Sequence, residues 1–149
     1  MYKTILVPLD GSKRAEGILP HVEELAQRYG ARVVFVRIIE PIPYVMGPEG
    51  TPMTLREQEL EQRQRDAKSY MDARVGEFRE MGIEAKAEVL QGPVVQGITD
   101  TAERVGADLI AIASHGRSGL SQCFYGSVAS GVLNRVDRPL LVIRSLADD

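Results

Sequence analysis

Residues 4–9 read TILVPL, and this apolar run carries the pattern that decides the fold. Its hydrophobic side chains follow one another almost without interruption, and β-branched residues are among them. Such a run is typical of a strand that helices cover on both faces, as in a parallel sheet. Asp10, Gly11 and Ser12 come next, so the predicted strand ends in a polar turn.

Further apolar runs of the same character are spread along the chain. They lie at residues 32–39, 85–90, 108–114 and 139–145. The run at 85–90, AKAEVL, alternates most clearly between apolar and polar side chains, and it therefore suits an outer strand.

Segments with a helical spacing of apolar residues separate these runs. The predicted helices span Ser12 to Gly30, Leu55 to Met81, Gly92 to Gly106, and Gly126 to about residue 136. Ser12 is the expected N-cap of the first helix. Met81 and Leu133 are expected on the buried stripes of the second and fourth helices.

The regular alternation of strands and helices predicts an α/β fold, a doubly wound five-stranded parallel sheet with helices on both faces. We expect the strand order 3-2-1-4-5 in one domain that spans residues 1–149. In this order, strands two and three are added on one side of strand one, and strands four and five on the other. The strand order therefore reverses between the first and fourth strands. Ligands bind such sheets beyond the carboxyl ends of the strands at the reversal.

Composition excludes several classes of function. The 149 residues carry a net charge of −3 with scattered Lys and Arg, so a non-specific nucleic-acid surface is not expected. The first apolar run is too short for a signal peptide or a membrane span. A single cysteine, Cys123, fits a reducing compartment and lacks the partners of a zinc site. We expect a cytoplasmic protein with neither a nucleic-acid nor a membrane partner; its protein partners stay unknown.

One segment interrupts the alternation. Residues 40–53, EPIPYVMGPEGTPM, are rich in proline and glycine and predict a long irregular loop. A loop of this length inside a compact domain is either disordered or functional, often as a lid. Pro43, Tyr44 and Met46 are candidates to line or cover a site at the sheet reversal.

Glycine and serine gather after the fourth predicted strand, where residues 113–128 read ASHGRSGLSQCFYGSV. A helix that begins at Gly126 and Ser127 would offer free N–H groups and a partial positive charge to a phosphate. Asp10 would lie across the reversal and accept hydrogen bonds from ribose or adenine. A surface loop, with Ser127 capping its own helix, explains the same residues without a ligand. Asp10 is equally compatible with a plain turn.

The chain resembles the universal stress protein family over nearly its whole length. Residues 1–12, MYKTILVPLDGS, are similar to the opening strand of the family, and residues 92–144 follow its C-terminal half. The nucleotide-binding branch of the family carries the motif G-x2-G-x9-G-[ST]. Here Gly116, Gly126 and Ser127 match the motif, and Ala113 replaces its first glycine. This replacement matters if the position requires a positive φ.

The resemblance implies ATP as the ligand, with or without magnesium, and a homodimer formed through the last strand, Pro139 to Arg144. It places adenine near Asp10 and Ile38, ribose near Ala113, and phosphates on Gly116, Gly126 and Ser127. The candidate nucleotide-binding residues are Pro8, Leu9, Asp10, Ile38, Ala113, His115, Gly116, Arg117, Gly119, Gly126, Ser127 and Val128. The edge position of an apolar last strand favours the dimer independently.

The function expected from these features is that of an ATP-binding stress sensor or regulator, and not of an enzyme. A slow ATPase and a nucleotide-free stress scaffold remain alternatives. His115 has no acidic or serine partner fixed by spacing, so an orienting or structural role is favoured over general-base chemistry. Arg117 suits either a terminal phosphate or a solvated loop. We assign no catalytic and no metal-binding residue.

Overall fold

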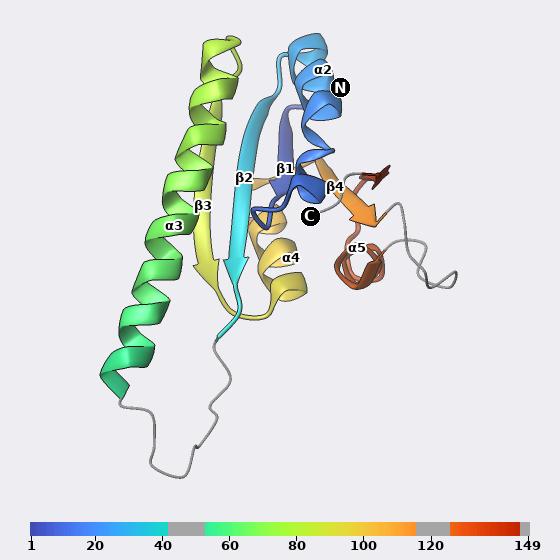
Figure 1. The fold of residues 1–149 in the computed structure, drawn as a ribbon. Coiled ribbons are helices and arrows are strands. Elements are labelled where there is room, and N and C mark those ends of the chain that lie inside the picture. Colours follow the sequence, from blue (N-terminus) through green and yellow to red (C-terminus); the bar gives the residue numbers. More distant parts are fainter. Residues whose placement is uncertain (42–52, 116–125, 147–149) are drawn as a thin grey trace.

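The structure is a computed structural model that describes residues 1–41, 53–115 and 126–146. Five parallel strands form its sheet (Figure 1). They are β1 (Thr4–Pro8), β2 (Arg32–Ile39), β3 (Ala85–Gln91), β4 (Leu109–His115) and β5 (Leu140–Ser145). Their order is β3-β2-β1-β4-β5, with every neighbouring pair parallel, which confirms the predicted fold and places β3 at an edge.

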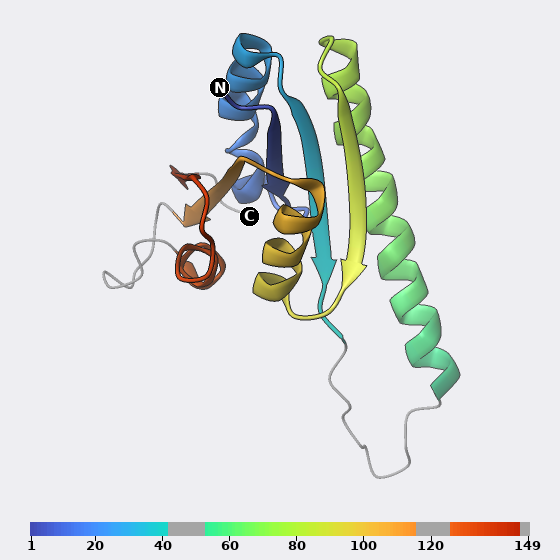
Figure 2. The same cartoon turned by 180° about the vertical axis from the view of Figure 1, so that it is seen from behind.

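Helices cover both faces of the sheet. They are α1 (Lys13–Glu16), α2 (Leu19–Tyr29), α3 (Met53–Glu80), α4 (Val94–Val105) and α5 (Gly126–Leu133). The first three lie on one face, and α4 and α5 cover the other, as the view from behind shows (Figure 2). The N-terminal turns of α3 extend beyond the carboxyl ends of β2 and β3 (Figure 1).

Each face has its own hydrophobic core. On the α3 face, Phe35 and Phe78 meet edge to face with ring centroids 5.0 Å apart, and both side chains are fully buried. On the α4 face, Ile98 and Val132 pack against Val34 and its neighbours in the central strands. Because the central strands are buried on both sides, their sequences show no polar alternation.

The predicted apolar stripe of α3 is correct where the helix crosses the sheet, at Ala67, Met71, Val75 and Phe78. Met81 and Leu133 were expected to be buried, and this is wrong: their side chains are 36% and 51% exposed. Met81 follows the last residue of α3, and Leu133 is the last residue of α5. At a helix end the chain turns away from the sheet, so the helical period no longer predicts burial.

The first predicted helix is in fact two helices, so the expectation of one continuous helix from Ser12 to Gly30 is wrong. Pro20 lacks an N–H group, and its ring would clash with the carbonyl of the residue four positions earlier in a continuous helix. Gly17 lies at the break, and a Cβ there would come within 2.8 Å of the Ser145 hydroxyl. The break therefore lets α1 approach the end of β5. Ser12 does cap α1, accepting a hydrogen bond from the Ala15 N–H.

Among the helices in the described part of the chain, none is long and apolar enough to cross a membrane.

The Phe35–Phe78 contact predicts a strong effect of truncation on stability. Phe78→Ala should lower the free energy of unfolding by about 3–5 kcal/mol, because it removes a buried ring and leaves a cavity. Leu133→Ala, on an exposed side chain, should change it by less than about 0.5 kcal/mol. Urea unfolding measures both values. Equal losses in the two variants would contradict the packing described here.

Candidate functional site

The sheet opens between β1 and β4 at their carboxyl ends. The two strands pair only at Ile5–Leu109 and Leu6–Ile110. On either side of them the pairing continues further, to Pro8 in the β1–β2 pair and to His115 in the β4–β5 pair. The opening therefore coincides with the reversal of strand order, where sheets of this class bind ligands.

A cavity of about 260 Å³ occupies this opening. Its walls are mostly apolar and come from β1, β2, β4, α1, α4 and α5, with charged side chains at Asp10, Arg14 and Glu40. The lining residues are Pro8, Leu9, Asp10, Arg14, Ala15, Val36, Ile38, Glu40, Val94, Ile98, Ile112, Ala113 and Val128. An apolar cavity with a few converging polar groups is the usual form of a small-molecule site.

The structure brings some of the candidate residues together and leaves others apart. Pro8, Leu9, Asp10, Ile38, Ala113 and Val128 line the cavity. Gly126 and Ser127 begin α5 and are not part of the lining. His115 ends β4, and its side chain is outside the described part of the structure. Gly116, Arg117, Gly119, Cys123, Pro43, Tyr44 and Met46 lie outside the described residues.

Several lining residues were not among the candidates. Val36 precedes Ile38 by two positions in β2, and Val94 and Ile98 are four apart in α4, so the strand and helix periods would have found them. Arg14 follows Asp10 by four residues. No signal in the sequence distinguishes this arginine from one that points into solvent.

Ala113 raises no conflict with the backbone. In the described residues, positive φ values occur only at glycines, and Ala113 lies within β4 with the ordinary backbone of a strand. The replacement of glycine by alanine in the motif therefore costs no strain here. Gly126, in contrast, has φ of 71°, a value that strongly favours glycine.

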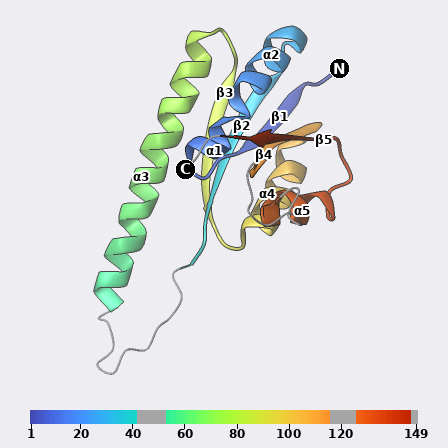
Figure 3. The same ribbon diagram turned by 45° about the vertical axis from the view of Figure 1, so that its right-hand side comes forward.

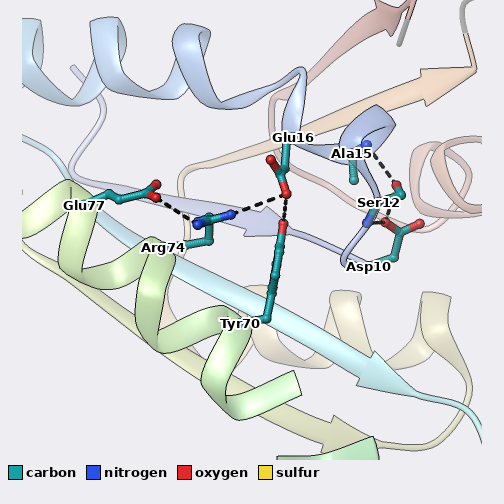
Figure 4. A network of polar contacts seen from close by, with 7 residues as sticks. All are labelled: Asp10, Ser12, Ala15, Glu16, Tyr70, Arg74 and Glu77. Carbon is teal, nitrogen blue, oxygen red and sulfur yellow. Dashed lines mark hydrogen bonds and ion pairs between the residues drawn. The ribbon is translucent and has the colours of Figure 1, made fainter. Parts of the chain in front are cut away.

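Asp10 folds the chain into a tight turn at the rim of the cavity (Figure 4). Its Oδ1 accepts hydrogen bonds from the Ser12 backbone N–H at 2.9 Å and from the Ser12 hydroxyl at 2.6 Å. The Ser12 hydroxyl in turn accepts a hydrogen bond from the Ala15 N–H at 3.1 Å. Asp10 is thus a structural turn residue, and its side chain also lines the cavity.

The Asp10 carboxyl group is ionised at neutral pH. Burial raises its pKa, but the hydrogen bonds from Ser12 and the charges of Arg14 and Arg37 outweigh this effect and hold the pKa below its usual value. The site therefore presents at its rim an ionised carboxylate that is paired with Arg14.

Arg14 bridges the opening. Its Nη2 donates to Asp10 Oδ2 at 2.9 Å, and its Nη1 donates to the Ala113 carbonyl at 3.4 Å. The first contact reaches the end of β1 and the second reaches β4, beyond the last pair of the β1–β4 ladder. The side chain of Arg14 is only 16% exposed.

A polar network joins α1 to α3 (Figure 4). The Tyr70 hydroxyl donates to Glu16, and Arg74 forms ion pairs with Glu16 at 3.4 Å and with Glu77 at 2.8 Å. Burial and the Glu16 carboxylate raise the pKa of Tyr70, so its hydroxyl stays protonated as a donor. The network fixes the short α1, which carries Arg14, against the long α3.

A second, larger hollow of about 550 Å³ lies between β2 and α3. It shares Asp10, Ile38, Glu40 and Val94 with the opening. Its outer wall comes from α3 and includes the exposed charged side chains of Arg63 and Asp66. Charged, solvated walls make it a weaker candidate for an apolar ring than the opening. In the described residues there is no group of three or more His, Cys, Asp or Glu side chains suited to a metal ion.

The whole chain is similar to proteins of one known family. The family model of the universal stress proteins matches residues 1–144. This chain belongs to the universal stress protein family. A universal stress protein of Thermus aquaticus is 31% identical over 144 residues, which cover 97% of this chain and 100% of the relative.

Solved universal stress proteins share the fold. Protein MJ0577 of Methanocaldococcus jannaschii is 28% identical over 155 residues, covering 97% of this chain and 96% of the relative. A solved structure of MJ0577 matches with a TM-score of 0.84 at 27% identity, covering 99% of each chain. A universal stress protein from Archaeoglobus fulgidus, solved in complex with dAMP, matches with a TM-score of 0.67 at 25% identity, covering 96% of this chain and 98% of that one.

The lowered pKa of Asp10 predicts a pH-dependent contribution to stability. Because the folded-state pKa lies below the unfolded value, near 3.8, ionised Asp10 stabilises the fold above that value. The contribution disappears as the pH falls through the folded-state pKa. Asp10→Asn should therefore be less stable than the wild type at pH 7 and nearly as stable at pH 2.5. Urea unfolding at both pH values checks this, and a difference independent of pH would contradict it.

Proposed function

We propose that this chain is a single-domain, ATP-binding universal stress protein that acts as a sensor or regulator. The observation that carries the proposal is the apolar cavity in the β1–β4 opening, with ionised Asp10 at its rim. A nucleotide combines a flat apolar ring, a sugar with hydroxyl groups and a charged tail. We assign the ring to the apolar walls of the opening, the sugar to Asp10 and the charged tail to the start of α5.

The adenine ring would occupy the apolar part of the cavity. Ile38 of β2, Ile98 of α4 and Val128 of α5 contribute side chains from three directions. The ribose would lie beside Asp10, because an ionised carboxylate is an acceptor for a hydroxyl group of the sugar. Asp10 therefore orients the sugar, and the apolar walls exclude water from the ring.

The phosphates would lie outside the cavity, toward the start of α5. Val128 lines the cavity and belongs to the first turn of α5, so the free N–H groups of this helix lie near its edge. Ser127 is exposed there and offers a hydroxyl. We extend the phosphate site to Gly116, Arg117, Gly119 and Gly126, and include His115 as an orienting residue, on the strength of the motif.

The related structures support an adenine nucleotide. The Archaeoglobus protein was solved with dAMP, which has the same base. We propose ATP as the ligand of this chain, with magnesium held through the phosphates. Among the described residues, those that line the cavity include no His, Cys or Ser. We propose binding as the activity, with at most weak ATP hydrolysis.

A homodimer would form through β5. This strand is at the edge of the sheet, beyond β4 (Figure 3), and its residues Leu140 to Ile143 are only partly buried in the single chain. Pairing with a second copy along Pro139 to Arg144 would satisfy the outer backbone groups of the strand and cover apolar surface. We place this dimer in the cytoplasm, in line with the single cysteine.

Calorimetric titration of ATP and magnesium into nucleotide-free protein tests the proposal. The wild type should bind one ATP per chain. Val128→Trp should abolish this binding, because the indole ring fills the space proposed for adenine. Leu133→Trp places the same ring on an exposed position of the same helix and should bind ATP as the wild type does. Circular dichroism checks that both variants fold.

Two results would refute this assignment. The first is an absence of binding by the wild type at millimolar ATP. The second is unchanged binding by a folded Val128→Trp variant, which would place ATP outside the opening.

A further inference from the structure

We propose that Arg14 determines ligand specificity in the β1–β4 opening. It favours adenine ligands with a phosphate on the 2′ or 3′ oxygen of the ribose. This inference rests on the proposed nucleotide site and adds a ligand class to it. The motif and the strand pattern do not include Arg14. Its position in the opening comes from the structure alone.

The guanidinium group of Arg14 lies in the β1–β4 opening. The β1–β4 ladder ends at Leu6 and Ile110, and Arg14 spans the gap beyond it, from Asp10 Oδ2 to the Ala113 carbonyl. The group is therefore inside the opening, next to the carboxylate that would hold the sugar. A charged side chain that is only 16% exposed keeps its full charge close to any ligand there.

The Asp10 carboxylate can accept only a limited number of hydrogen bonds. Its Oδ1 already accepts two hydrogen bonds from Ser12, and its Oδ2 accepts one from Arg14. A carboxylate has about four lone-pair positions, so room remains for one hydroxyl group of a ribose. The neighbouring oxygen on the 2′,3′ edge of the sugar would then lie beside Arg14.

Negative and positive side chains both surround the place proposed for the 2′,3′ edge of the sugar. Asp10 and Glu40 would repel a phosphate if they stood alone. Arg14 neutralises Asp10, and its planar fork of N–H groups suits two phosphate oxygens at once. In dinucleotide-binding folds a carboxylate about 20 residues beyond the first glycine-rich turn, and so at a different strand end, binds the ribose hydroxyl, and a nearby arginine accommodates a phosphate on that oxygen. Both kinds of group are present here, side by side.

A ligand could replace the hydrogen bond between Arg14 and the Ala113 carbonyl. Its contact with the neutral Ala113 carbonyl is 3.4 Å long, beyond the usual range for an N–H···O bond. A phosphate oxygen would replace it with a shorter, charge-assisted bond, while the 2.9 Å bond to Asp10 stays in place.

Contacts at both ends of α1 hold Arg14 in position. The Ser12 cap fixes the start of α1, and the contacts of Tyr70 and Arg74 with Glu16 fix its end. Arg14 lies between these two anchors. The guanidinium group is thus held in the opening before a ligand arrives, which reduces the entropic cost of its contact with a phosphate.

The test compares the affinities of adenosine, AMP with its phosphate on the 5′ oxygen, and the 2′- and 3′-monophosphates of adenosine. In the wild type, the better of the 2′ and 3′ isomers should bind about tenfold more tightly than adenosine, as expected for a hydrogen bond between charged groups. Arg14→Gln should lower about tenfold the ratio between the affinity for that isomer and the affinity for adenosine, both measured in the same variant.

Two further variants provide matched controls. Arg14→Lys keeps the charge but loses the fork, so it should retain part of the preference. Lys13→Gln removes the same charge from an exposed neighbour in α1 that does not line the cavity, and it should retain all of it. Thermal unfolding confirms that each variant is folded.

The outcomes separate the two proposals. If ATP binds but Arg14→Gln leaves the preference unchanged, the role of Arg14 is overturned and the nucleotide site stands. If Arg14→Gln binds every ligand more tightly, Arg14 blocks the opening and the inference is likewise overturned. If the wild type binds neither ATP nor any of the adenosine ligands, the nucleotide site itself is refuted together with the inference.

Discussion

The pairing between β1 and β4 ends at Leu6 and Ile110, and the properties of the site depend on this early separation. Up to that point the backbone groups of the two strands bind one another. Beyond it, β1 turns at Asp10 and β4 continues along β5, so a wedge of space opens in the middle of the sheet. Parallel order with a reversal in the centre makes such a wedge unavoidable. The apolar walls follow, because the side chains around the wedge belong to buried strands.

Three features convert this wedge into a chemically defined site. The Ser12 hydrogen bonds and the nearby arginines keep Asp10 ionised. Arg14 spans the gap and satisfies the carbonyl of Ala113 that β1 does not reach. The network around Glu16 ties α1 to α3 on the face of the sheet that these two helices share (Figure 4).

The strands could be predicted from the sequence, because strands buried on both faces leave continuous apolar runs such as residues 4–9. These runs do not give the strand order directly, and the expected order 3-2-1-4-5 is confirmed by the structure. The break in the first helix had a signal in Gly17 and Pro20, but the apolar stripe continues across it and conceals it. Arg14 could not be predicted, since a charged residue in a helical turn usually faces water, and only the separation of two distant strands gives it a buried place. The central part of the glycine motif, residues 116–125, stays a prediction.

A crystal structure of the protein with ATP tests the central claim most directly, because it asks where the nucleotide lies. The account predicts adenine between the side chains of Ile38, Ile98 and Val128, with the ribose beside Asp10 and the phosphates toward the start of α5. Adenine in the larger hollow between β2 and α3, beside Arg37 and Tyr70, would contradict it, because the β1–β4 opening would then not be the site.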